Sequence, residues 1–309
     1  MKKLFGLFLL ALAFFAPDFA QAATCFWVGG TGTWDNATNI LSWASGTGGT
    51  PGTCAATGSI PKQATDIATF DANSGGGVVT VDSTINGVTM AQIIAGAFTG
   101  TLDFSVNNPS MTLTTAMSLT GTGARKFLLG TGTFTLTGTG TVYDLTTVTN
   151  LDGTSNFAAN FTLSATTTGT RTFAGGGRTY GALTVSTNTS RGFVVLSGAN
   201  TFSSFSLAAG TSFVFPVTAT TIITNAFTWI GTSTNPINLQ ASSVSSGSAP
   251  VISVGSGTST CDWCSIYEIA PAGGGTFNAT NSFDQGRNSG WTFTPPSGGG
   301  GGGIIGSGI

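Results

Sequence analysis

Residues 160–186 read NFTLSATTTGTRTFAGGGRTYGALTVS, and this stretch decides the expected fold. It carries the tripeptides Phe161-Thr162-Leu163 and Leu183-Thr184-Val185, which lie 22 residues apart. The same step leads on to Phe205-Ser206-Leu207 and Phe227-Thr228-Trp229. Alternation with a period of two places the apolar side chains on one face of a strand and the hydroxyl on the other. A spacing kept over four tripeptides predicts strands stacked in successive coils of a solenoid.

Similar tripeptides extend the series in both directions. Met111-Thr112-Leu113 and Phe134-Thr135-Leu136 precede it and Ile252-Ser253-Val254 follows it, with steps of 23, 27 and 25 residues. A β-sandwich also alternates, but it has no reason to keep such a register. We therefore expect an all-β chain folded as a right-handed parallel β-helix with coils of about 22–27 residues. The expected core column consists of Met111, Leu113, Phe134, Leu136, Phe161, Leu163, Leu183, Val185, Phe205, Leu207, Phe227 and Trp229.

The N-terminus has the pattern of a secretory signal peptide. Lys2 and Lys3 precede an apolar run over residues 4–16, and Ala20-Gln21-Ala22 supplies the small residues that a signal peptidase requires. The apolar run is shorter than the roughly 20 residues of a spanning helix. Residues 1–22 are therefore predicted to be a cleaved signal peptide, and no later segment is expected to span a membrane.

The remaining chain is expected to have three parts. Residues 23–88 are predicted to form an N-terminal β cap, in which Trp27, Trp34 and Trp43 form a core rather than a sugar-stacking surface. Residues 89–294 are expected to form the solenoid, and the segment from Gln92 to Phe98 suits either a strand or a helical turn. Residues 295–309 contain six consecutive glycines and are expected to be a flexible tail.

Charge is scarce in this chain. It contains 9 Lys and Arg and 11 Asp and Glu among 309 residues, so 6% of its residues are charged, against about 25% in ordinary soluble domains. Histidine is absent, which excludes Ser-His-Asp and Cys-His catalysis and any His-ligated metal site. A net charge of −2 argues against nucleic-acid binding, which needs clustered cations. No cofactor is expected.

Four cysteines are expected to be structural. An even number of cysteines behind a signal peptide suggests disulfides, and four cysteines allow three pairings. We favour Cys25 with Cys54, because both lie in the Gly/Thr-rich N-terminal segment. Cys261 and Cys264 form a CxxC motif, and residues three apart in an extended strand lie too far apart to be bridged. Either this segment turns, or the two thiols do not pair with each other.

Two segments carry a family resemblance. Residues 26–35 (FWVGGTGTWD), followed by Ser42-Trp43, Asp66 and residues 70–77 (FDANSGGG), resemble the start of a group of Gly/Thr-rich repetitive β-solenoid proteins. These proteins come from bacterial surfaces and phage tail regions. Residues 170–180 (TRTFAGGGRTY) are similar to a recurrent coil of the same group. The resemblance implies adhesion or virion structure, and it brings no catalytic residues. The predicted signal peptide departs from the phage members.

Candidate catalytic and metal-binding residues are few. Asp144 and Asp152 are the nearest acidic pair in the solenoid, and a glycosidase needs two carboxylates about 5–10 Å apart. The only basic group comprises Arg171, Arg178 and Arg191, which are expected to be solvated charges at coil corners. The segment beginning at Asp71 has alternate oxygen groups like a short calcium loop, but an Asx-turn is the favoured interpretation. No catalytic or metal-binding residue is predicted.

The outward positions beside the core column form a two-column hydroxyl array. This possible ligand face consists of Thr112, Thr114, Thr135, Thr137, Thr162, Ser164, Thr184 and Ser186, and it fades towards Ser206/Ala208 and Thr228/Ile230. Thr-x-Thr ladders on β-solenoids resemble those of ice-binding proteins. Threonine is, however, also a good outward strand residue in any sheet.

Three functional hypotheses follow. The leading one is a non-catalytic, secreted structural or adhesive solenoid, on the bacterial surface or as part of a virion, with cell-surface glycans or another surface or virion protein as its partner. The second is a carbohydrate-binding or carbohydrate-active β-helix, and the third is an ice-binding solenoid. The oligomeric state is left open.

Overall fold

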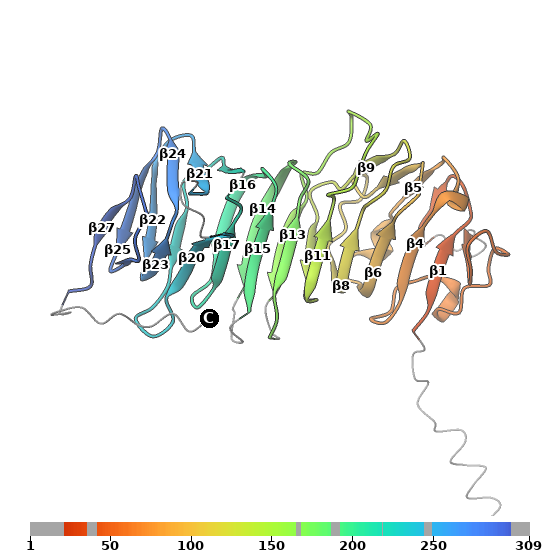
Figure 1. The fold of residues 1–309 in the computed structure, drawn as a ribbon. Coiled ribbons are helices and arrows are strands. Elements are labelled where there is room, and N and C mark those ends of the chain that lie inside the picture. The colour runs from red at the N-terminus through yellow and green to blue at the C-terminus, as the bar shows by residue number, and fades with distance from the viewer. Residues whose placement is uncertain are drawn as a thin grey trace, which may run out of the picture.

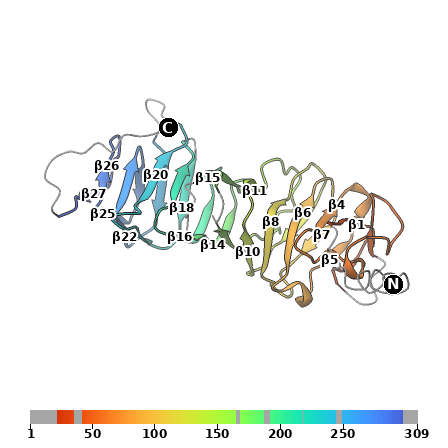
Figure 2. The ribbon, with the colours of Figure 1, turned by 90° about the horizontal axis from the view of Figure 1, so that it is seen from below.

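The computed structural model describes residues 22–35, 42–164, 168–186, 192–217, 219–243 and 249–297. These residues form a parallel β-solenoid whose strands lie side by side along one long axis, from β1 to β27 (Figure 1). The same order of strands is visible when the molecule is turned (Figure 2). Residues 1–21 of the predicted leader and residues 298–309 of the predicted tail lie outside this description, as does Arg191.

The N-terminal coils consist of two parallel ladders. The first contains β1 (Thr24–Trp27), β4 (Ile67–Phe70), β6 (Thr89–Ala95) and β8 (Met111–Ser118), and the second contains β2 (Gly32–Thr33), β5 (Val78–Thr80), β7 (Thr101–Asp103) and β9 (Lys126–Leu128). Strand β3 (Trp43–Ala44) pairs antiparallel with β1. Short 3-10 helices η2 (Thr57–Ser59), η3 (Ala72–Ser74) and η4 (Ser83–Ile85) lie between the strands.

These ladders cross the expected boundary between the cap and the solenoid. Parallel stacking begins at β1, and β4 pairs with β6 from Ile67↔Gln92 to Phe70↔Ala95, across the predicted boundary at residue 88. Strands of the N-terminal segment therefore stack in parallel on the strand that follows the expected boundary. The prediction that its aromatics form a core is confirmed, because Trp27, Trp34 and Trp43 are all fully buried. The segment around Gln92 is a strand.

Two walls face each other in the middle of the molecule. The front wall contains β8, β10 (Thr133–Leu136), β12 (Asn160–Ser164), β14 (Thr179–Ser186) and β16 (Thr201–Leu207). The back wall contains β11 (Gly140–Asp144), β13 (Arg171–Ala174), β15 (Phe193–Ser197) and β17 (Ser212–Phe215). Phe161 pairs in register with Phe134 and Leu183, and Leu183 pairs with Phe205, so the 22-residue repeat corresponds to one coil.

The C-terminal coils contain a third strand per turn. They consist of β18 (Thr220–Ile223), β19 (Thr228–Ile230), β20 (Ile237–Ala241), β21 (Val251–Val254), β22 (Thr258–Asp262), β23 (Cys264–Tyr267), β24 (Ala270–Gly273), β25 (Thr276–Thr280), β26 (Phe283–Asp284) and β27 (Thr292–Thr294). Strand β19 forms a separate ladder with β22, β25 and β27, while β18 continues β16. The long front strand is thus replaced by two shorter ones.

This split corrects two members of the predicted series. The amide of Asn225 donates to Ser203 O at 2.8 Å and holds the bend between β18 and β19, so Phe227 is not paired in register with Phe205. Ile252 pairs with Thr221 in β18 and belongs to another column. Continuity is kept by packing, because Trp229 Nε1 donates to Phe205 O at 2.8 Å and the two rings lie 5.5 Å apart. All twelve residues of the expected core column are buried.

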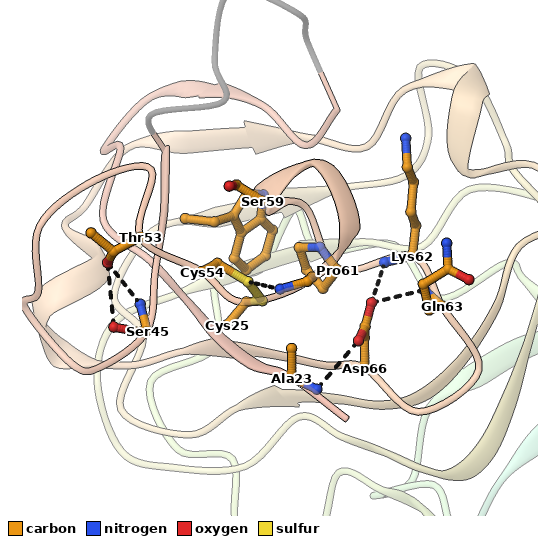
Figure 3. Close-up of a disulfide and its surroundings, with 12 residues drawn as sticks. Ala23, Cys25, Ser45, Thr53, Cys54, Ser59, Pro61, Lys62, Gln63 and Asp66 are labelled. Atoms are coloured by element: carbon orange, nitrogen blue, oxygen red, sulfur yellow. Dashed lines mark hydrogen bonds between the residues drawn. A yellow bond between two sulfur atoms is a disulfide. The ribbon is translucent and has the colours of Figure 1, made fainter. Parts of the chain in front are cut away.

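Two disulfides are present, Cys25–Cys54 and Cys261–Cys264 (Figure 3 shows the first). The favoured first pairing is confirmed. In the second, the chain turns at Trp263, which has a φ of 53° and separates β22 from β23, so that the Cα atoms of the two cysteines lie 5.9 Å apart. Of the two alternatives left open by the sequence, the CxxC segment therefore turns, and its two cysteines pair with each other.

The first disulfide should matter more for stability than the second. Replacing Cys25 and Cys54 together by alanine should lower the free energy of unfolding by about 3–4 kcal/mol, because the bond closes a loop of some 30 residues in the unfolded chain. The matched Cys261→Ala/Cys264→Ala variant opens a loop of only about four residues and should cost about 2 kcal/mol. Denaturant unfolding of both variants gives the comparison, and a reversed order would contradict it.

Candidate functional site

The outward surface of the front wall is the main candidate site, and we call the 15 outward residues of β8, β10, β12, β14, β16 and their ends the hydroxyl face. Its central column is fixed by strand register, since Thr135 pairs with both Thr112 and Thr162, and Thr184 pairs with both Thr162 and Ser206. Neighbouring strands in a sheet lie about 4.8 Å apart, which sets the spacing of these hydroxyls. The side chains are half-buried, and Ser206 is exposed.

Two further columns flank the central one. One contains Thr114, Thr137, Ser164, Ser186 and Ala208, with Ser164 directly paired to Ser186. The other contains Ser110, Thr133, Asn160, Ala182 and Ser204, with Thr133 paired to Asn160 and Ala182 paired to Ser204. Residues two apart on a strand are separated by about 6.6–6.8 Å. The face is therefore a regular grid of three columns and five rungs.

The hydroxyl face contains no charged side chain, because its members are Ser, Thr, Asn and Ala only. The hydroxyls of Thr112, Thr135, Thr162 and Thr184 make no hydrogen bond to another described residue, so they are available to a ligand or to water. Some flanking groups have internal partners: Asn160 Nδ2 donates to Thr131 O at 3.0 Å, and Ser186 Oγ donates to Leu163 O at 3.4 Å. All eight residues of the predicted ligand face lie on this grid.

A shallow groove forms a second candidate site. It is lined by residues 151–158 of the connection between β11 and β12, together with Arg178, Thr179 and Tyr180. The Arg178 guanidinium lies 6.0 Å from the centroid of the Phe157 ring. The longer step between Phe134 and Phe161 in the sequence reflects this connection. The groove combines the half-buried cation of Arg178 with the exposed carboxylate of Asp152, while its two aromatic residues, Phe157 and Tyr180, are buried.

The nearest acidic pair of the solenoid is engaged in local turns. Asp144 Oδ1 accepts from the amide and hydroxyl of Thr146 at 2.9 and 2.7 Å, and Asp152 Oδ1 accepts from those of Thr154 at 2.7 and 2.5 Å. The hydroxyl and then the amide of Thr154 lower the pKa of Asp152. A general acid needs a raised pKa, so the shift at Asp152 runs against that role.

The predicted calcium-like loop is an Asx-turn. Asp71 caps η3, where its Oδ1 accepts from Asn73 N at 2.8 Å, while Asp71 N donates to Ser74 Oγ at 2.9 Å. The favoured interpretation of this segment is therefore confirmed. Within the described part of the chain, no group of three or more acidic, cysteine or histidine side chains is arranged so that it could hold a metal ion.

The arginines correct the sequence-based expectation. Arg171, predicted to be a solvated corner charge, is fully buried, and its Nη1 donates to Gly169 O at 3.2 Å. Arg178 is half-buried. Arg125, which the sequence pattern did not single out, is also buried. Burial lowers the pKa of Arg125 and of Arg171. Both guanidinium groups lie inside the solenoid, where they hydrogen-bond main-chain carbonyls.

Two buried tyrosines lie near the groove. Burial raises the pKa of Tyr143 and of Tyr180 far above the ordinary value, so both stay neutral. Tyr180 uses its hydroxyl to donate to Gly175 O at 2.5 Å. Their rings belong to the aromatic core, with Tyr143 stacked on Phe173 at 4.7 Å and Tyr180 stacked on Phe202 at 5.7 Å. We assign both tyrosines to packing.

No helix among the described residues has the length and apolar character needed to cross a bilayer. Comparison of the whole chain with protein-family models, with curated proteins and with solved structures gives no match.

Proposed function

We propose that this chain is a non-catalytic, exported β-solenoid that serves a structural or adhesive role, and that the hydroxyl face is its binding surface for a neutral, hydroxyl-rich glycan. The observation that carries the proposal is the register of uncharged side chains. Thr112, Thr135, Thr162, Thr184 and Ser206 occupy one column on successive coils. Two columns of the same polarity lie beside it.

The chemistry of the face suits a neutral ligand. A charged glycan needs compensating charges at its binding surface, and none of the 15 positions supplies one. A single neutral hydrogen bond contributes only about 0.5–1.5 kcal/mol, so useful affinity requires many of them at once. An extended polysaccharide that lies along the coils would contact hydroxyls repeated at a fixed spacing, and it could therefore form many hydrogen bonds at once. Two disulfides agree with an oxidising compartment outside the cytoplasm.

Ice binding is the second candidate, because the central column is a ladder of threonines. The flanking columns favour the glycan instead. Asn160, Ala182, Ser164 and Ser186 interrupt the uniform Thr surface that a crystal lattice would meet. A glycan presents hydroxyls in mixed orientations and tolerates such variety. Thermal hysteresis in a solution of the purified protein would favour ice binding over the glycan.

The proposal predicts that a carboxylate in the centre of the hydroxyl face abolishes binding. The chain should be retained by an insoluble neutral polysaccharide such as cellulose or chitin, and Thr162→Glu should weaken retention at least about tenfold, because binding would desolvate the new charge. Thr172→Glu is the matched control, since Thr172 is a half-buried outward residue on β13 of the back wall. Equal binding by both variants, or retention by neither polysaccharide, would contradict the proposal.

A further inference from the structure

Asp66 is a buried carboxylate beside the first strand. Its side chain is fully buried, Oδ1 accepts from Ala23 N at 3.3 Å, and Oδ2 accepts from Lys62 N at 3.1 Å and from Gln63 N at 2.9 Å (Figure 3). These partners are three main-chain amides. The carboxylate is therefore hydrogen-bonded, but none of these three partners carries a positive charge.

The nearby lysine serves another group. Lys62 Nζ donates to Asp35 Oδ2 at 3.0 Å, and its side chain points away from Asp66 in Figure 3. No lysine or arginine forms an ion pair with Asp66 anywhere in the ranges that the structure describes. Removing a carboxylate from water is costly, and buried carboxylates in proteins are normally paired with a cation. Asp66 occupies a site that a positive charge would complete.

The residue at this site is the first one after the predicted cleavage point. Ala22 ends the small-residue motif Ala20-Gln21-Ala22 and is exposed, whereas Ala23 is buried. The position of Ala23 is fixed from both sides, since its carbonyl accepts from Ile67 N at 2.8 Å and β1 begins at Thr24. Cleavage before Ala23 would therefore release a chain whose first nitrogen already lies against the carboxylate.

We propose that the Ala22–Ala23 peptide bond is the processing site, and that processing creates a buried ion pair between the α-ammonium group of Ala23 and Asp66. Water, delivered by a signal peptidase, hydrolyses the bond. The C–N bond breaks, the Ala22 carbonyl carbon takes the oxygen of the water and becomes the carboxylate of the departing peptide, and the Ala23 nitrogen takes up both protons of the water. The amide with one N–H is thereby replaced by an ammonium group with three donors and a full charge. Export thus completes the fold of the first coil.

The sign of the pH dependence follows from this pairing. An unperturbed α-amino group has a pKa of about 7.7–8.0, and a buried anionic partner raises that value in the folded chain. The added stability is present below the unfolded pKa and is lost as the pH rises through the folded pKa. The other charged groups near the site are Asp35 and Lys62, which pair with each other, and the adjacent Cys25–Cys54 disulfide does not titrate.

Three chains test the inference. The first is the full chain, expressed with its leader and recovered after export, and its N-terminal residue is expected to be Ala23. The second starts at Ala23 after release from a fusion partner, and the third carries one additional glycine before Ala23, which keeps the Ala23 amide but moves the charge. At pH 6 the Tm of the second chain should exceed that of the third by about 2–6 °C. In an Asp66→Asn background this difference should disappear.

Three results would overturn the inference. They are an exported chain that begins elsewhere, equal Tm values for the two starts, or a difference that survives Asp66→Asn. If the Asp66→Asn chain does not fold, the pH series decides, because a difference that stays constant up to about pH 11 is not caused by an ammonium group. The inference does not depend on the hydroxyl face, and glycan binding can fail while the ion pair forms.

Discussion

Truncation of Phe161 to alanine is expected to lower the free energy of unfolding by about 3–5 kcal/mol, as large-to-small substitutions of buried phenylalanines do. Phe161 lies at the centre of the column, 1% exposed, and pairs with Phe134 and Leu183 on the adjacent coils. Its ring meets four others, with centroid distances of 4.7 Å to Tyr143, 5.1 Å to Phe173, and 5.6 Å to both Phe134 and Tyr180. Removing the ring would therefore leave a cavity between the front and back walls.

The measurement is denaturant unfolding of the variant beside the wild type, with Thr162→Ala as the matched control. Thr162 is the next residue on the same strand and faces outward, so its substitution should change stability by no more than about 0.5 kcal/mol. In a solenoid each coil contacts only its neighbours, so hydrogen exchange should accelerate first in β10, β12 and β14. Comparable losses from both substitutions would show that the column is not the source of stability.

The register of the front wall could be predicted because the sequence repeats it. Each coil places a hydrophobic residue, a hydroxyl and a second hydrophobic residue at the same point, and the pairing of Phe134, Phe161, Leu183 and Phe205 follows. The predicted register was wrong at the C-terminal coils, where the same tripeptide pattern no longer indicates which ladder a strand belongs to. Phe227-Thr228-Trp229 looks like the next rung, but the bend held by Asn225 moves it into a separate ladder.

The hydroxyl face could be predicted because it follows from the same sequence repeat as the front wall. Outward positions alternate with core positions, so the hydroxyl face follows directly from the core column. The burial of Asp66 and Arg125 does not follow from it, because each side chain also has partners on another coil. Asp66 meets Ala23, which is 43 residues away, and Arg125 meets Ala95 and Gly96, which are about 30 residues away. A local pattern holds no information about such contacts.

Arg125 should be as important to stability as the aromatic column. It is 2% exposed, its Nη1 donates to the carbonyl oxygens of Ala95, Gly96 and Thr120, and its Nε donates to Gly123 O at 2.9 Å. One guanidinium thus satisfies main-chain acceptors from separate parts of the N-terminal coils. Methionine has a similar length but no donor, so Arg125→Met removes the donor from one buried bond, that to Ala95 O, and from three part-buried ones.

The expected cost of Arg125→Met is about 2–4 kcal/mol, because several main-chain acceptors lose a charged donor and an unsatisfied buried acceptor alone costs about 1–3 kcal/mol. Lys126→Met is the matched control, because it removes the same charge from the neighbouring half-buried residue and should change stability by no more than about 0.5 kcal/mol. Denaturant unfolding of the two variants separates loss of charge from loss of hydrogen bonds. If Arg125→Met proved as stable as Lys126→Met, the carbonyls would have to be satisfied without the guanidinium, and the buried arginine would not be what joins these coils.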